Sequence, residues 1–141
     1  GISRYASEIA KEQIQSINEK KYELKAIRDL VDEAYKVIIS SKGNFIEFGK
    51  LLNESWELKK QLSSKISNSE IDHIYETAIR HGAVGGKLLG AGGGGFMLLY
   101  IEQEAQKRVK EALKGYLHIP FMFDFSGSEI IVYKPSYQNG R

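Results

Sequence analysis

The chain has 141 residues, no cysteine and a net charge of +2, from 20 basic and 18 acidic side chains. Its length suits one domain with its own apolar core, and the absence of cysteine excludes disulfides and thiolate metal sites. The small positive charge does not indicate nucleic-acid binding. The sequence shows neither a membrane-spanning stretch nor a leader that is charged and then apolar, so we expect a cytoplasmic protein without a membrane partner.

Glycine and proline divide the chain into two parts. Residues 1–81 contain three glycines and no proline, whereas eight of the 14 glycines lie between Gly82 and Gly95. We expect a single domain over residues 1–141. Its first part, about residues 1–82, should be helical, and its second part, about residues 83–141, should be rich in strands.

Apolar residues recur at helical spacing in four stretches of the first part, which predicts four helices. The third should begin at Asn44, because Glu47 follows three residues later as in a capping box. By the same pattern the fourth should begin near Ser67, with Glu70 three residues later, and it should end at Gly82. The predicted buried faces are Ala6, Ile9, Gln13 and Ile17; Leu24, Ile27, Val31, Ala34 and Ile38; Phe45, Phe48, Leu52 and Trp56; and Ile71, Ile74, Tyr75, Ala78 and Ile79.

The second part adds strands, so the predicted fold class is α+β. Strands are expected at Lys87–Leu89 and Phe96–Ile101, followed by a helix over Glu102–Lys114. A hairpin is expected from Phe121–Phe125 and Glu129–Tyr133. The order strand, strand, helix, strand, strand predicts an antiparallel or mixed sheet of four strands, with the helices packed on one face.

A run of glycines lies between the first two predicted strands. Residues 90–95 contain five glycines in six positions, and each costs roughly 0.5–1 kcal/mol relative to alanine in regular structure. Glycines with positive φ can turn several N–H groups toward one point and so bind an anion. They also allow another backbone or a phosphate to come close. A tight turn is the plainer interpretation, but it needs only one or two glycines.

Three familiar phosphate-binding motifs do not fit this run. Gly90, Gly92 and Gly95 match G-x-G-x-x-G, but a strand follows where the dinucleotide fingerprint requires a helix. The chain lacks the H-R-D and D-F-G motifs of protein kinases. Gly86-Lys87 is followed by leucine, which excludes a Walker loop.

A fourth motif does fit. Residues 82–96 read Gly-Ala-Val-Gly-Gly-Lys-Leu-Leu-Gly-Ala-Gly-Gly-Gly-Gly-Phe. This stretch resembles the third conserved motif of the GHMP small-molecule kinases, G-x-x-G-x-K-x-x-G-A-G-x-G-G followed by a strand. The resemblance implies that nearly the whole chain is the C-terminal half of such a kinase. That half has helices followed by a ferredoxin-like sheet.

Within this family the chain resembles the kinases that act on D-glycero-D-manno-heptose 7-phosphate, at residues 1–7 and again at residues 94–97. The resemblance implies transfer of the γ-phosphate of ATP, with Mg²⁺, to the anomeric hydroxyl of that sugar phosphate. The family's P-x-x-x-G-L-G-S-S motif and its acidic base are absent from these residues. We therefore expect the N-terminal half of the same kinase as a partner that holds most of the ATP and Mg²⁺ contacts. These residues alone should be inactive.

The resemblance also assigns a role to the glycine run. In the family this loop packs against the phosphate-binding loop and shapes the pocket of the transferring phosphate. A valine at position 93 or 94 should then impair the kinase more than the fold. The role is implied for Gly90, Ala91, Gly92, Gly93, Gly94 and Gly95.

Other polar residues have more than one interpretation. Lys87 is either a point charge for a phosphate or a solvated lysine at a sheet edge. Arg4 either contacts the sugar phosphate or lies on the surface. The spacing of the three histidines suits no metal site, and His81 is best explained as a helix-end residue. Strand alternation places Asp124 on the solvent face, so we assign no catalytic residue and no metal ligand within the chain.

One alternative to a kinase domain remains open. The chain would then be a free-standing ferredoxin-like module that binds a small anion, as a regulatory or structural element without catalysis. The reading frame before Gly1 discriminates the two hypotheses. A P-x-x-x-G-L-G-S-S motif there favours the kinase, and a start codon beside Ile2 favours the module.

Overall fold

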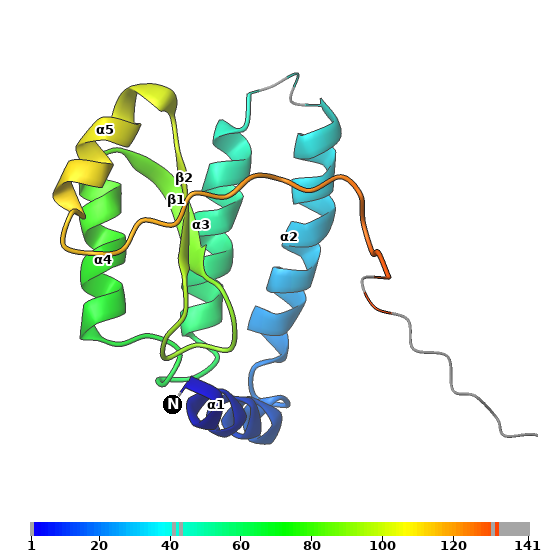
Figure 1. Cartoon of the computed structure of the whole chain (residues 1–141). Coiled ribbons are helices and arrows are strands. Elements are labelled where there is room, and N and C mark those ends of the chain that lie inside the picture. The colour runs from blue at the N-terminus through cyan, green and yellow to red at the C-terminus, as the bar shows by residue number, and fades with distance from the viewer. Residues whose placement is uncertain (1, 41, 43, 131, 133–141) are drawn as a thin grey trace, which may run out of the picture.

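The computed structural model describes residues 2–40, 42, 44–130 and 132, with residues 2–6 described by their backbone alone. Its elements are helices α1 (Ile2–Ser16), α2 (Lys21–Ser40), α3 (Ile46–Lys60) and α4 (Ser69–Arg80), strands β1 (Ala83–Leu88) and β2 (Met97–Ile101), and helix α5 (Gln103–Ala112). In Figure 1, α2 and α3 stand on one side of the strands, α4 and α5 on the other, and α1 crosses below them. The predicted α+β class and the order of these seven elements are confirmed.

The two strands form an antiparallel hairpin, which is the only sheet in the described part of the chain. Leu88 pairs with Met97 beside the connecting loop, and Ala83 pairs with Ile101 at the far end. β1 begins earlier than the predicted Lys87, because Gly85 and Gly86 pair with β2 instead of forming a turn. The hairpin therefore presents residues 89–96 as a loop at one end of the sheet.

Helix α3 packs against β1 where both backbones lack side chains. The carbonyl oxygen of Gly49 fills the position that a Cβ atom on Gly85 would take, and Asn53 lies against Gly85 one turn further along α3. Both glycines are buried. This approach needs glycine on the strand, and it fixes the N-terminal half of α3 relative to β1.

The main core lies where α1, α3, α4 and β1 meet. Trp56 of α3 has no exposed surface and packs against Tyr75, with ring centroids 6.2 Å apart. Burial of each large apolar side chain stabilises the fold by about 1.5–3 kcal/mol. A smaller cluster of Ala78, Ala83 and Val109 holds α5. The main cluster consists of Ile9, Trp56, Leu62, Ile66, Ile71, Tyr75 and Leu88.

The two predicted capping boxes are wrong in detail. The N-cap of α4 is Asn68 rather than Ser67, because its side chain accepts hydrogen bonds from the N–H groups of Glu70 and Ile71. α3 begins at Ile46, whose N–H donates to the side chain of Asn44. The adjacent Asn68 outcompetes Ser67, because asparagine caps at least as well as serine.

The predicted buried face of α2 is wrong in part. Of the predicted residues, Ile27 is partly buried against the main core, but Val31 and Ile38 are 64% and 51% exposed. The buried residue of α2 is Leu30, which the prediction did not include. The cause is that α2 packs chiefly on α3. This helix covers only part of the predicted apolar face of α2, so the rest of that face is exposed. Although α2 has 20 residues, the described part of the chain contains no helix with the length and apolar composition that crossing a bilayer requires.

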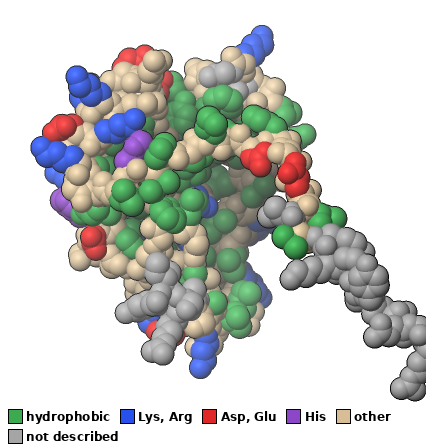
Figure 2. Space-filling model, in the orientation of Figure 1, with side chains coloured by type: hydrophobic (Ala, Val, Ile, Leu, Met, Phe, Trp, Pro, Cys, Tyr) green, Lys and Arg blue, Asp and Glu red, His purple; other side chains and the backbone are tan. Residues whose placement is uncertain are grey.

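The predicted second hairpin, and with it the four-stranded ferredoxin-like sheet, is not found. Residues 121–130 form no strand, and residues 131 and 133 lie outside the described part of the chain. In Figure 1 the chain that follows α5 crosses in front of the strands, α3 and α2 without joining the hairpin. A strand needs a partner for its N–H and C=O groups, and here Phe121, Phe123 and Phe125 are exposed. Hydrophobic side chains accordingly gather on this face in Figure 2.

Candidate functional site

The glycine loop between β1 and β2 folds back onto the connection between α3 and α4. A Cβ atom on Gly92 would lie 2.7 Å from the Cα atom of Ile66, and the N–H of Gly93 donates to the carbonyl oxygen of Ile66 at 2.9 Å. Four glycines of the run have positive φ, between 70° and 133°. Close backbone approach, one of the two roles predicted for the run, is therefore present in the fold.

The loop also leaves several backbone donors unused. No hydrogen bond within the described residues involves the N–H groups of Ala91, Gly92, Gly94 or Gly95. The pair between the N–H of Leu89 and the carbonyl oxygen of Phe96, at 2.8 Å, closes the loop at its base. Two successive N–H groups on residues whose φ signs differ, as at Ala91 and Gly92 and at Gly94 and Gly95, suit an anion.

Two lysines approach the base of the loop from neighbouring elements. Lys87 extends from β1, is partly buried, and donates to the hydroxyl oxygen of Ser55 on α3 at 3.0 Å. Lys59 lies one turn further along α3. Its Nζ donates to the carbonyl oxygen of Gly90 at 2.5 Å and lies 3.4 Å from that of Leu88. The structure therefore places Lys87 against α3 and adds Lys59 to the candidate site.

The ammonium group of Lys87 lies close enough to Lys59 to affect its charge state. Burial lowers the pKa of Lys59, and repulsion from Lys87 lowers it further. Among the described residues, neither lysine forms an ion pair with a carboxylate. Glu12 on α1 is engaged elsewhere, with Ser63 and Lys65. The site thus holds positive charge without a protein counter-charge.

The lysines line a pocket of about 270 Å³. Ser55 and Lys59 share one face of α3, since residues four apart are neighbours on a helix. Sequence reasoning missed both, because the spacing shows which side chains share a face but not that this face meets Lys87. The complete lining is Gln13, Leu24, Ile27, Ser55, Lys59, Leu62, Lys87, Gly90 and Ala91.

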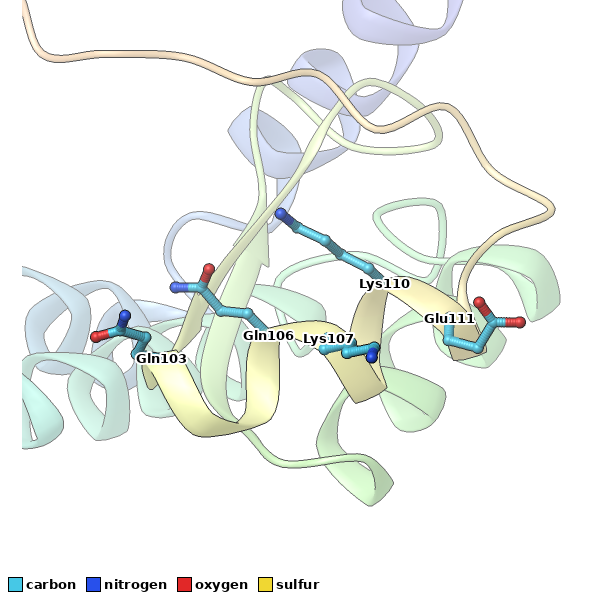
Figure 3. Close-up of a pocket in the computed structure, with 5 residues that line it drawn as sticks. All are labelled: Gln103, Gln106, Lys107, Lys110 and Glu111. Carbon is cyan, nitrogen blue, oxygen red and sulfur yellow. The ribbon is translucent and has the colours of Figure 1, made fainter.

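A second hollow, along α5, does not form a comparable site. It measures about 490 Å³ and is lined by Gln103, Gln106, Lys107, Lys110 and Glu111. All five side chains are exposed and belong to one helix, and Figure 3 shows them pointing in different directions. Ligand sites generally place polar groups so that they converge.

The remaining candidate residues are Arg4, His81 and Asp124. Arg4 is in α1, and its side chain lies outside the described part of the structure, so its role stays a prediction. His81 is the C-cap of α4, where its Nδ1 lies 2.8 Å from the carbonyl oxygen of Thr77, as expected of a helix-end residue. Asp124 is exposed, as predicted. The Ser126 hydroxyl holds the pKa of Asp124 below its usual value.

Comparison with known proteins identifies relatives for this arrangement. A family model described as GHMP kinases C terminal matches residues 27–119. A D-glycero-alpha-D-manno-heptose 7-phosphate kinase of Campylobacter jejuni is 32% identical over 120 residues, which are 82% of this chain and 35% of that protein. A mevalonate kinase of Methanocaldococcus jannaschii is 39% identical over 67 residues, which are 48% of this chain and 20% of that protein.

A solved structure supports the same conclusion at the level of the fold. The mevalonate kinase of L. major in complex with R-mevalonate matches with a TM-score of 0.64 and 23% identity, over 78% of this chain and 34% of that one. The chain thus spans about a third or less of the length of these relatives. The region that the family model matches contains the glycine loop, Ser55, Lys59 and Lys87. The chain belongs to the GHMP kinase family, in which it corresponds to the C-terminal domain.

Proposed function

We propose that the chain is the C-terminal domain of an ATP-dependent kinase that phosphorylates a sugar, with the anomeric hydroxyl of D-glycero-D-manno-heptose 7-phosphate as the acceptor. The observation that carries the proposal is the structure of the glycine loop. Its backbone packs against Ile66, and several of its N–H groups have no hydrogen-bond partner among the described residues. The similarity to the Campylobacter enzyme supports the heptose phosphate as acceptor. The mevalonate kinases support only the coarser statement of a small-molecule kinase.

The proposed role of the loop follows from the chemistry of phosphoryl transfer. Such enzymes act mainly by positioning the reactants and stabilising negative charge on the transferring group. Donors held in place before the reaction do this best, because they need no reorganisation in the transition state. The hydrogen bonds from Gly93 to Ile66 and from Lys59 to Gly90 hold the loop in this way. The N–H groups of residues 91, 92, 94 and 95 would then donate to phosphate oxygens of ATP, with Lys87 as a nearby phosphate-binding charge.

The rest of the site is proposed to come from an N-terminal half of the same kinase. This chain spans 35% of the length of the Campylobacter relative. The described residues contain no group of three or more His, Cys, Asp or Glu side chains that suits a metal ion. We propose that this other half holds Mg²⁺ and makes most of the ATP contacts. Arg4 in α1 remains a proposed contact of the sugar phosphate.

The test is a substrate screen with this domain joined to its N-terminal half. ADP formation would be measured with D-glycero-D-manno-heptose 7-phosphate, galactose and mevalonate as acceptors. We expect turnover with the heptose phosphate and none from the 141-residue chain alone. Turnover with mevalonate or galactose only would overturn the heptose assignment. No turnover with any acceptor would favour the anion-binding module without catalysis.

A further inference from the structure

The pocket below the glycine loop combines charge, donors and an apolar wall. Lys59 and Lys87 approach it from α3 and β1, and Ser55 and Gln13 add polar groups from α3 and α1. Leu24, Ile27 and Leu62 form its apolar side. Helices α1, α2 and α3, strand β1 and the glycine loop therefore all contribute to this one pocket.

The lysines keep donors free for a ligand. An ammonium group carries three N–H donors. Lys87 uses one on Ser55, and Lys59 uses one on Gly90 and directs a second, at 3.4 Å, toward Leu88. At least one N–H donor of Lys59 and two of Lys87 therefore remain available to a ligand, and both side chains line the same pocket.

The charges in the pocket are costly without a counter-ion. Both lysines are partly buried, and two like charges at one wall repel each other. Within the described structure no carboxylate pairs with either lysine, although six ion pairs form elsewhere. An anion in the pocket would satisfy the free donors and neutralise both charges.

We propose that this pocket is a phosphoryl subsite, in which Lys59 and Lys87 bind the oxygens of a phosphate group. The volume of about 270 Å³ lies just below the roughly 300–1,000 Å³ of pockets that enclose whole ligands. It therefore suits a phosphate group with the adjoining carbon of its carrier, which would lie along Leu24, Ile27 and Leu62. Gln13 and Ser55 are placed to contact hydroxyl groups.

Two carriers present this chemistry, the acceptor sugar phosphate and the nucleotide. The identity of the carrier rests on the proposed function, whereas binding of a phosphate group does not. The first experiment therefore uses inorganic phosphate with the 141-residue chain at low ionic strength, followed by NMR of the backbone amides and the lysine side chains. We expect phosphate to shift the amides of residues 55, 59, 87 and 90 and to raise the pKa of Lys59.

Substitutions then locate the binding. Lys59→Gln and Lys87→Gln should each weaken phosphate binding about tenfold or more, since each removes a charged donor. Lys59→Arg keeps the charge and should stay within a few-fold of the parent chain. Lys50→Gln is the matched control, because Lys50 lies on the same helix but is exposed and paired with Glu47. Melting curves monitored by the fluorescence of Trp56, the single tryptophan, establish that each variant folds. The Lys87→Gln variant also keeps the hydrogen bond from Lys59 to Gly90, so the loop stays anchored in it.

The second experiment titrates ATP and D-glycero-D-manno-heptose 7-phosphate separately into the same variants. Whichever ligand loses affinity in both lysine variants is the carrier. No phosphate-induced shift at these residues, or equal affinity in the parent chain and both variants, would overturn the proposal. Phosphate binding fails or succeeds independently of the kinase assay, so the two claims are tested separately.

Discussion

Gly92 lies so close to Ile66 that a Cβ atom at position 92 would come within 2.7 Å of the Ile66 Cα atom. Ile66 is itself fully buried in the main core. The contact joins the glycine loop to the connection between α3 and α4. The loop is therefore part of the packed structure, and its glycines do not all serve one purpose.

The first prediction separates two glycines of the loop. Gly92→Ala should destabilise the fold by about 2 kcal/mol or more, because the new methyl group meets Ile66 and alanine is strained at positive φ. Gly94→Ala should change the free energy of unfolding by less than about 0.5 kcal/mol, because nothing lies within 4 Å of its Cβ position. Urea unfolding of both variants measures the difference. Equal destabilisation would mean that the loop does not rest on Ile66.

The second prediction concerns the contact between α3 and β1. Gly85→Ala should be strongly destabilising, by about 1–3 kcal/mol or more, because its methyl group would overlap the carbonyl oxygen of Gly49. Gly115→Ala is the control, since its Cβ position is open. Thermal unfolding of the two variants is the measurement. A Gly85→Ala chain as stable as the control would show that α3 does not approach β1 this closely.

The third prediction concerns the start of α4. Asn68→Ala should cost about 1 kcal/mol, because the N–H groups of Glu70 and Ile71 lose their acceptor. Ser67→Ala should cost less, since the Ser67 hydroxyl donates to Asp72 and caps no N–H group. Chemical denaturation of the two variants compares them. A larger loss of stability from Ser67→Ala than from Asn68→Ala would show that Ser67 is the N-cap of α4.

The fourth prediction is a dependence of stability on pH. Burial raises the pKa of Tyr75 from 10.0 to about 12, and its hydroxyl donates to Asn53. Between these values the unfolded chain loses a proton that the folded chain keeps, so stability should fall as pH rises from about 10 to 12. Unfolding of the parent chain and Tyr75→Phe, followed by circular dichroism from pH 9 to 12, isolates this contribution. The parent should lose stability more steeply, and parallel curves would contradict the assignment.

Periodicity and turn residues were sufficient to predict most elements but not the extent of the sheet. The stripes containing Ile9, Trp56 and Tyr75 correctly indicate core-facing helices, because burial on one helical face is a local pattern. The alternation of Phe121, Phe123 and Phe125 is equally regular, yet these side chains are exposed. Alternation shows that a segment is suited to a sheet, whereas pairing depends on a neighbouring strand that no local pattern specifies.

The candidate site could also be predicted only in part, because packing between distant segments brings some of its residues together and no local pattern shows this. The density of glycine identified the loop, because its backbone requirement is visible in the sequence. Lys59 was missed because its importance depends on the packing of α3 against β1. The structure also separates two positions that the sequence treated alike. Gly93 has a φ of 70° and its N–H is bonded to Ile66, so valine there would disturb the fold, whereas position 94 is open.

The role of the glycine loop in phosphoryl transfer is tested by the turnover number of the Gly94→Val variant in the complete kinase, measured as ADP release with saturating ATP and heptose phosphate. The valine side chain would occupy the open space beside the unused N–H groups, where we propose that a phosphate binds. We predict a fall in kcat of about 100-fold, because the side chain would keep the phosphate away from these N–H groups and the loss of one such donor interaction has an effect of about this size. The melting temperature should be unchanged. A variant that turns over as fast as the parent enzyme would contradict the claim that this loop supports phosphoryl transfer.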